Sequence, residues 1–595
     1  MLEQEKLHYS VIALYMSTLI SQGACLEAAS AGFVMAANAP VDAAGAAAAD
    51  AENGAVTRRV DAVEADAGRR EGASKPVDGP FEISASVDGV ATPTVAPLGG
   101  GDAMEEALCQ LGPFGPYQRY VLTLLCLPNL LAAIYSLNYV FVADQVPFRC
   151  LVPECEGLGG DFGNASVQGL LAVDPCRRFA PPDEGATCSR EDYHPVDTVE
   201  CDAFVYADHS TIYAEFGLAC REWLRTLVGS VRNAALPLAL LLTGHVSDRW
   251  GRRTAFCIFS ACAGVMGLLK SFSVGYHMYV ILEFLEAALG YGFGSAAYIM
   301  VVELARPSLR APFACATGVA YGAGGVLFAW LAWRLPHWRA LLRAAYAPAL
   351  LLPFYWRLVD ESPRWLHATA TPARAADVLR KAARWNKVTI NEELLKSIAA
   401  GKRVEERQSV SWLELVRSRA MVVRLAVCGW CWIAAAFTYY GLTINSVSLS
   451  GEKHVNFALN MAMEIVASLL IMMALERFGR RRSILASFAL CGVACVTPLF
   501  VSHFSASLWL YFVGKLGATA AFNSLYVYTA ELFPTRVRSR ALATCSLVGR
   551  VGSVLAPQTP LLSKPVQTLL YGGCALSAAL VLLAVPETRR TPLLH

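Results

Sequence analysis

Two short stretches of the sequence decide the fold: residues 244–253 read GHVSDRWGRR, and residues 476–481 read ERFGRR. An offset of 228 residues takes Asp248 to Glu476 and Gly251 to Gly479. The same offset relates five further pairs: Arg252 and Arg480, Arg253 and Arg481, Tyr298 and Tyr526, Glu303 and Glu531, and Arg310 and Arg538. Several matches at one fixed offset indicate an internal repeat, which predicts two halves of parallel topology.

Apolar segments of membrane-spanning length surround both stretches. The chain is 55% hydrophobic and only 16% charged, whereas a soluble domain is usually about 25% charged. Because a helix needs about 20 mostly apolar residues to cross a bilayer, the sequence predicts an all-α membrane protein of two pseudo-symmetric six-helix bundles. Its twelve transmembrane helices are expected near residues 120–142, 224–246, 254–274, 278–302, 312–333, 339–359, 421–443, 455–475, 483–502, 508–530, 541–562 and 566–585.

The remaining segments complete the predicted domain organisation. Residues 1–110 are rich in Ala, Gly, Asp, Glu and Val and are almost free of aromatic residues, a composition typical of a disordered tail. The apolar stretch 11–20 in this tail is too short to span a bilayer, and the leader MLEQEK before it is not basic, so a signal peptide is not expected. The expected order is a tail at 1–110, a first half at 111–359 with a long loop at 143–223, a linker at 360–420, a second half at 421–588, and a short tail at 589–595.

Basic residues are concentrated in alternate loops. Arginines follow spans 2, 4, 8, 10 and 12, and the linker after span 6 is also basic, while the intervening loops are nearly uncharged or acidic. Lys and Arg favour the cytoplasmic side of a membrane, so both ends of the spanning region are expected to be cytoplasmic. Arg334, Arg339 and Arg343 near an outer loop are exceptions, and the rule holds by majority.

The long loop after span 1 carries the signs of an extracellular domain. It holds an N-glycosylation acceptor at Asn164 and six cysteines: Cys150, Cys155, Cys176, Cys188, Cys201 and Cys220. An even number of cysteines in an outer loop indicates disulfide bonds, although six cysteines allow fifteen pairings and the sequence does not choose among them. Metal binding is the rival interpretation, but no two of these cysteines form a CxxC pair.

Several motifs together resemble a known family. Gly-x-x-x-Asp-Arg-x-Gly-Arg-Arg at 244–253 resembles the signature loop of the major facilitator superfamily. Further motifs read ESPRWL at 361–366, ELFPTR at 531–536 and PET at 586–588. Together with the cysteine-rich loop they resemble the organic ion transporters of the solute carrier 22 family, and TIYAEF at 211–216 and RTLVG at 225–229 resemble its insect members. The resemblance covers about residues 112–590. It implies a plasma-membrane transporter of small organic ions that works by alternating access.

Charged residues at the predicted cytoplasmic helix ends form a candidate gate. Alternating access needs contacts that hold in one state and break in the other. Positive-inside anchoring would explain the arginines alone, but it does not explain acidic residues repeated at one offset. The resemblance implies a gate made of Asp248, Arg252, Arg253, Glu303, Arg310 and Glu361 in the first half, and of Glu476, Arg480, Arg481, Glu531, Arg536 and Glu587 in the second.

Two ionisable residues inside the predicted spans are candidates for substrate binding. Arg550 lies near the middle of span 11 and Glu464 lies in span 8, and charges at such depth are expensive to bury and usually functional. A structural pair between them is the alternative. By resemblance, an arginine at 550 is typical of anion transporters, Glu464 matches a position that is acidic in both kinds, and Ser468 replaces a lysine of some anion members. An anion or a zwitterion is therefore expected, with a cation as the alternative.

Aromatic residues near these charges complete the candidate binding site. Aromatic faces offer apolar area and cation–π attraction to organic ions, although ordinary helix packing would claim part of any such set. By resemblance the candidates are Tyr321, Tyr439, Tyr440, Phe522 and Tyr526.

Other classes of function fit the sequence less well. The sequence carries no catalytic triad, phosphate loop or metal cluster, so an enzyme, a cofactor or a bound metal is not expected. A net charge of +2 gives no reason to expect a nucleic-acid partner. A non-transporting surface receptor and a sugar facilitator remain as alternatives on the same fold. The six-cysteine loop favours the organic ion branch, and the sequence does not indicate a coupling ion.

Overall fold

The structure, a computed structural model, describes residues 100–588 apart from gaps at 113, 158, 182–187, 195, 306–309, 370, 402–417, 502 and 535–536. Residues 1–99 and 589–595, which hold most of the predicted tails, lie outside the described residues. We call the end of the helical bundle that carries the cysteine-rich loop the outer end, and the end that carries the arginine motifs the inner end. Both names follow the predicted orientation.

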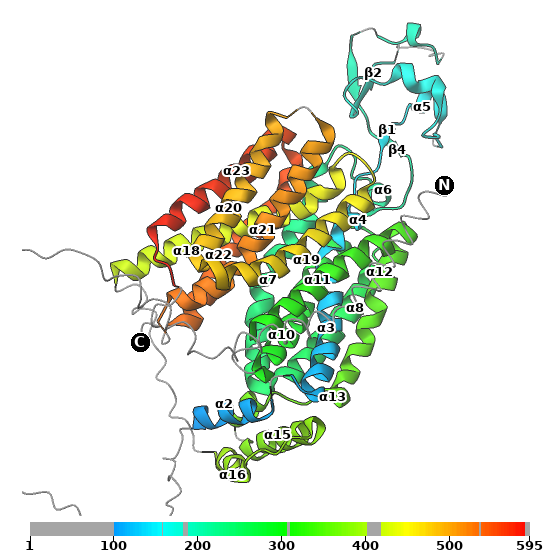
Figure 1. The fold of residues 1–595 in the computed structure, drawn as a ribbon. Helices are drawn as coiled ribbons and strands as arrows, with labels where there is room; N and C mark the ends of the chain where they lie inside the picture. The colour runs from blue at the N-terminus through cyan, green and yellow to red at the C-terminus, as the bar shows by residue number, and fades with distance from the viewer. Residues whose placement is uncertain are drawn as a thin grey trace, which may run out of the picture. The chain divides into compact units, whose positions relative to one another are not determined.

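The first half contains six membrane-spanning segments, as predicted (Figure 1). They are α3 (Pro116–Leu137) with α4 (Tyr139–Val142), α7 (Glu222–Trp250), α8 (Arg252–Lys270), α9 (Tyr276–Gly290) with α10 (Gly292–Leu304), α11 (Arg310–Arg334), and α12 (Trp338–Tyr346) with the 3-10 segment η5 (Ala347–Phe354) and α13 (Tyr355–Leu358). The sixth segment leaves α-helical geometry at η5, where Pro348 and Pro353 have no backbone N–H to donate.

The second half repeats this series. Its segments are α18 (Arg419–Ile444) with η6 (Asn445–Ser448), α19 (Lys453–Phe478), α20 (Arg480–Val496) with η7 (Thr497–Leu499), α21 (Phe504–Leu532), α22 (Arg538–Leu555) with η8 (Ala556–Leu561), and α23 (Lys564–Val581) with η9 (Leu582–Ala584). Nine segments among the described residues are long and apolar enough to cross a membrane. The broken sixth segment, α21 and α22 occupy the other three predicted spans, so the twelve-helix prediction is confirmed.

The cysteine-rich loop folds into a small domain held by three disulfides, Cys150–Cys201, Cys155–Cys188 and Cys176–Cys220. It contains β1 (Phe148–Cys150) paired with β4 (Phe204–Tyr206), β2 (Arg177–Phe179) paired with β3 (Thr198–Glu200), α5 (Pro153–Glu156), η2 (Ala165–Leu170), η3 (Arg190–Asp192) and α6 (Ile212–Glu215).

Two polar groups organise the centre of this domain. Arg149 donates to Glu156 over 2.8 Å and both side chains are almost fully buried. Hydrogen bonding from this guanidinium holds the pKa of Glu156 below its ordinary value. Asn164 caps η2 through its side chain, and its Nδ2 donates to Glu156 over 3.1 Å. Its glycosylation stays a prediction.

Short helices cover the inner end of the first half: α14 (Pro363–Ala368), α15 (Pro372–Asn386), α16 (Glu392–Ala400) and α2 (Gly100–Gln110). The apolar face of α2 is buried, including Met104 and Leu108, and α2 packs against α16. The sequence assigned 100–110 to a disordered tail, and for these residues that prediction is wrong. The segment holds small alanines and a single leucine, so its sequence gave little indication of a helix that packing stabilises.

Candidate functional site

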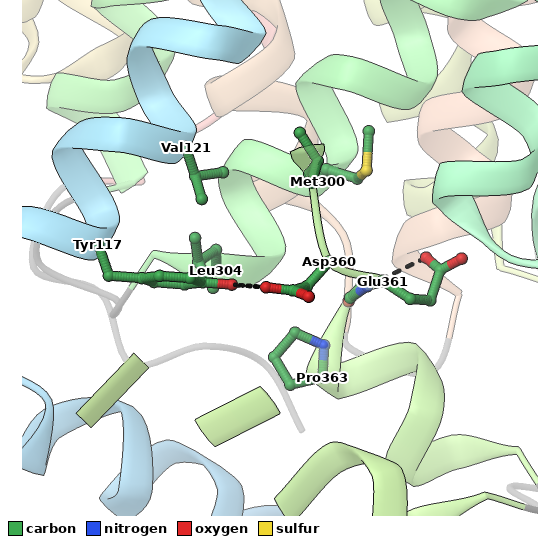
Figure 2. A pocket seen from close by; sticks show the side chains of 9 residues that line it. Tyr117, Val121, Met300, Leu304, Asp360, Glu361 and Pro363 are labelled. Carbon is green, nitrogen blue, oxygen red and sulfur yellow. Dashed lines mark hydrogen bonds between the residues drawn. The ribbon is translucent and has the colours of Figure 1, made fainter. Parts of the chain in front are cut away.

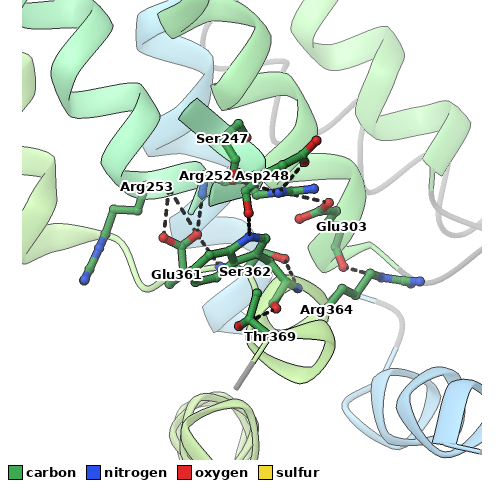
Figure 3. Close-up of polar contacts among 10 residues, drawn as sticks. Ser247, Asp248, Arg252, Arg253, Glu303, Glu361, Ser362, Arg364 and Thr369 are labelled. Atoms are coloured by element: carbon green, nitrogen blue, oxygen red, sulfur yellow. Dashed lines mark hydrogen bonds and ion pairs between the residues drawn. The ribbon is translucent and has the colours of Figure 1, made fainter. Parts of the chain in front are cut away.

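The first inner cluster is built around Arg252 at the start of α8 (Figure 3). Its Nε lies 3.1 Å from Glu303 of α10, and its Nη1 lies 3.0 Å from Asp248 at the end of α7. Arg364 of α14 adds a further link, because its Nε donates to the Glu303 carbonyl over 2.7 Å. The cluster therefore joins the inner ends of spans 2, 3 and 4.

Glu361 caps the N-terminus of α8. Its Oε1 accepts hydrogen bonds from the backbone N–H of Arg252 at 2.9 Å and of Arg253 at 3.1 Å. A carboxylate is stabilised there by the unpaired amides and the helix dipole. Gly251 makes the approach possible, since it has φ +97° and an added Cβ would lie 2.2 Å from Glu361 Oε2.

The second half repeats this geometry. Arg480 Nε lies 3.2 Å from Glu531, and the backbone N–H of Arg480 donates to Glu587 over 2.8 Å. Gly479 again has φ +97°. Glu587 therefore takes the place of Glu361, and the repeat inferred from the sequence is also a structural repeat.

Three predicted gate residues lie outside these clusters. Glu476, the counterpart of Asp248, is exposed and forms no ion pair with any described residue. Arg536 lies outside the described residues, and of Arg310 only the backbone, at the start of α11, is described. Within the described parts of the chain, every ion pair of the two clusters stays inside its own half.

Polar contacts between the two halves gather at the outer end. Ser230 of α7 donates to the Val554 carbonyl over 2.8 Å, and Thr226 donates to Gln558 over 3.0 Å. Lys453 at the start of α19 pairs with Asp144, just beyond α4, over 2.7 Å. We call these contacts, with the aromatic contacts described next, the outer seal.

Aromatic rings fill the rest of the outer seal. The Phe141 ring of α4 stacks on His454 at 5.2 Å and meets Phe457 edge-on at 5.0 Å. An added Cβ at Gly229 of α7 would lie 2.8 Å from the Tyr139 ring and 2.9 Å from Pro557 of η8. These short approaches show that the two halves are in close contact at the outer end.

Glu464 lies deeper between the helices of the second half. Its Oε1 accepts a hydrogen bond from the Tyr439 hydroxyl over 2.7 Å, and its Oε2 lies 3.8 Å from Lys515 of α21. The Lys515 ammonium lies 3.5 Å from the centre of the Tyr439 ring and donates to Thr443. A pair between Glu464 and Arg550 was the alternative interpretation, but the structure gives Glu464 a different cation.

Arg550 has no carboxylate partner among the described residues. It is 7% exposed, and its Nε has no hydrogen-bond partner in the described parts of the chain. Its electrostatic partners are the hydroxyl groups of Tyr291, Tyr440 and Tyr526. The guanidinium therefore sits among phenols, which can orient it but do not neutralise it.

The predicted aromatic residues come together around these charges. Tyr439 stacks on Phe522 at 5.2 Å, and Phe522 meets Tyr526 edge-on at 5.8 Å. Tyr440 packs on Tyr439, and the hydroxyl of Tyr321 from α11 interacts with Tyr440 and Glu464. The first half therefore contributes Tyr321 to this group.

Sequence reasoning missed three members of this group: Lys515, Tyr291 and Tyr298. Tyr298 is 42% exposed and Tyr526, its counterpart in the repeat, is 40% exposed, and the two hydroxyls interact. The 228-residue repeat had already paired Tyr298 with Tyr526, and Lys515 is a charged residue inside a predicted span. The sequence therefore held a signal for Tyr298 and one for Lys515.

A small pocket lies next to the first inner cluster, whose Glu361 is one of the lining residues (Figure 2). Tyr117, Met300, Leu304, Asp360 and Pro363 are among its lining residues. Asp360 accepts a hydrogen bond from Tyr117 over 3.0 Å and pairs with Lys381 of α15. These contacts tie α15 and the 359–363 segment to span 1.

The fold and this arrangement of charges define a two-half membrane transporter of the major facilitator type, not an enzyme. A family described as "Sugar (and other) transporter" matches residues 197–595. The chain belongs to this family, and its curated relatives are named as organic cation transporters and solute carrier 22 members.

Relatives match over most of the chain. "Organic cation transporter protein" of Drosophila melanogaster is 29% identical over 525 residues, covering 82% of this chain and 93% of the relative. "Organic cation/carnitine transporter 2" of Rattus norvegicus is 29% identical, covering 82% and 92%. Human "Solute carrier family 22 member 13" is 28% identical, covering 81% and 90%. Among solved structures, the E. coli xylose transporter XylE in a partially occluded inward open conformation is 17% identical, with TM-score 0.52 over 80% of this chain and all of that chain. This last likeness supports the fold alone.

Proposed function

We propose that the protein moves small organic ions carrying an anionic group, either anions or zwitterions, across the plasma membrane by alternating access. The observation that carries the proposal is the charge balance at the central site. Lys515 lies close enough to neutralise Glu464, whereas Arg550 has no acidic partner among the described residues. An unneutralised buried cation in a membrane is costly, and an anionic substrate group would remove that cost.

A simple organic cation is the second candidate. The Drosophila and rat relatives are named as organic cation or cation/carnitine transporters. The rings of Tyr439, Tyr440 and Phe522 offer the faces that cations prefer. For this candidate, however, Arg550 would repel the substrate.

The two inner clusters support the alternating-access part of the proposal. They fix the inner helix ends separately in each half while the outer seal joins the halves. In the opposite state the outer seal opens and the inner ends approach each other. The acidic and basic side chains of the clusters are then available to pair across the halves, as a gate requires.

The test is uptake of a zwitterion, an anion and a cation by cells that express the protein. Radiolabelled carnitine, benzoate and tetraethylammonium serve as probes, with surface protein measured in parallel. We expect uptake of carnitine or benzoate that falls about tenfold or more in Arg550→Ala, since a charge-assisted hydrogen bond is lost. Arg550→Lys, which keeps the charge, is the matched control and should retain part of the uptake. Strong tetraethylammonium uptake that is unchanged in Arg550→Ala would establish the cation alternative instead.

A further inference from the structure

A network of four buried charges lies inside the first half, away from the inner cluster and the central site. Arg232 of α7 pairs with Glu283 over 2.8 Å and also with Glu286, both on α9. Lys270 at the end of α8 pairs with Glu283 over 2.6 Å and lies 3.7 Å from Glu286. All four side chains are at most 4% exposed. Two cations and two anions balance, which makes their burial tolerable.

The second half carries no charges at the equivalent positions. The repeat offset takes the four positions to residues that carry no charge: Asn460, Pro498, Tyr511 and Gly514. The two halves nevertheless share the same fold and the same inner cluster geometry. A six-helix half of this kind therefore forms without the four charges, and their presence in the first half needs a reason of its own.

The network reaches the break in span 1. Lys270 Nζ lies 3.3 Å from Asn138 Oδ1 and 3.4 Å from the Tyr346 hydroxyl of α12. Asn138 Nδ2 in turn donates to that hydroxyl over 3.0 Å. Asn138 is fully buried and is the residue between α3 and α4. Lys270 and Tyr346 therefore both contact Asn138, at the point where span 1 is interrupted. We call the contacts among these three residues the clasp.

Beyond that break, α4 supplies the first half's share of the outer seal. Tyr139 packs against Gly229 beside Pro557, and Phe141 stacks on His454. Asp144, two residues beyond the end of α4, pairs with Lys453. Asn138 keeps helical backbone angles (φ -57°, ψ -37°), so α4 continues the course of α3, and its placement depends on how Asn138 is held.

We propose that Lys270 is a positioning residue that acts through Asn138: it clasps the break in span 1 and thereby holds α4 where the outer seal can close. Glu283 holds the lysine ammonium in place at 2.6 Å, aimed at the break, and Arg232 and Glu286 complete the charge balance. The consequence for transport rests on the proposed function, but the closure of the seal itself does not.

The test measures access to the seal without any substrate. A Thr226→Cys reporter lies within the seal, where Thr226 is 4% exposed; every variant carries it, and its reaction with a membrane-impermeant maleimide is followed on intact cells. The chain without the reporter cysteine gives the background. The test variant is Lys270→Met with Glu283→Gln, which removes one charge of each sign and leaves the Arg232–Glu286 pair. The matched control is Arg232→Met with Glu286→Gln, which removes as much charge but keeps Lys270, Glu283 and the clasp.

We expect the test variant to label about tenfold faster than the reporter parent, the factor that loss of a charge-assisted hydrogen bond corresponds to, and the control to label like the parent. Equal labelling rates in the test and control variants, whether slow or fast, would overturn the proposal. The four charges would then stabilise the helical bundle without a specific role at the outer seal. If the test variant does not reach the surface, Asn138→Ala decides, because it removes the clasp without touching a charge. Unchanged labelling there also overturns the proposal. A protein that transports none of the probes still gives this result, so the failures of the two proposals are distinguishable.

Discussion

Gly251 occupies the turn between α7 and α8, where the chain has φ +97° and Glu361 approaches the helix end. An L side chain is strained at this φ, and the added Cβ would lie 2.2 Å from the Glu361 carboxylate. The glycine in the signature motif therefore follows from the position of the carboxylate that caps α8.

We predict that Gly251→Ala destabilises the protein by about 1–3 kcal/mol, the usual cost of a strained backbone position. Gly244→Ala is the control from the same motif, because nothing lies within 4 Å of its added Cβ and alanine is favoured over glycine inside a helix. The measurement is the unfolding temperature of each variant in detergent, followed by size-exclusion fluorescence. Equal unfolding temperatures for the two variants would show that the close approach to Glu361 is not important.

The buried charges show what the sequence could and could not predict at this scale. Arg550 and Glu464 were predicted to be functional because a charge inside a span is costly, and the same rule applied to Lys515 and Lys270 would have found both. Their partners were not predictable. Which side chains meet depends on how each helix is rotated about its axis, and long apolar helices with weak amphipathicity leave that rotation undetermined in the sequence.

At the scale of elements, the inner clusters differ in how tightly their carboxylates are held. Glu303 pairs with Arg252, the first residue of α8, and Glu531 pairs with Arg480, the first residue of α20, whereas Glu476 is exposed and makes no ion pair with the described residues. The sequence treated all three alike, because an offset reveals which positions correspond and says nothing about which way each side chain points.

We predict that Glu303→Ala and Glu531→Ala each lower uptake per surface molecule at least about fivefold, since each frees an arginine of the gate and shifts the balance between states. Glu476→Ala serves as the control and should transport like the wild type. The measurement is initial uptake of whichever probe the wild type accepts, divided by surface protein. A loss in Glu476→Ala as large as in Glu531→Ala would contradict the assignment of roles within the clusters.

The existence and order of the helices followed from hydropathy, but two kinds of detail did not. The interruption of span 1 at Asn138 has no proline or glycine to mark it; there the Asn138 side chain donates to the Tyr135 carbonyl and contacts Lys270 and Tyr346. The disulfide pairing depends on which strands of the loop domain meet, and β1 with β4 and β2 with β3 bring together segments far apart in the sequence.

At the scale of the whole molecule, the contacts between halves explain how a repeat becomes a transporter. α11 packs against α19, and α7 packs against α22 and η8, while each inner cluster stays within its own half. Under the proposed function, the two halves rock about the proposed central site, which takes residues from both halves. The sequence predicted this architecture through its 228-residue repeat, but it could not predict that the outer end is the closed one here.

The most direct test of the account is to lock the outer seal. Asp144→Cys and Lys453→Cys replace the ion pair that joins the halves at 2.7 Å, and a short bifunctional methanethiosulfonate then links the two thiols. Wild-type protein treated with the same reagent, and later with the same reductant, controls for the native cysteines. We expect that linking abolishes probe uptake in the double variant alone and that mild reduction restores it. Uptake that continues through a fully linked seal would show that the halves do not rock apart at their outer ends, and would contradict the account.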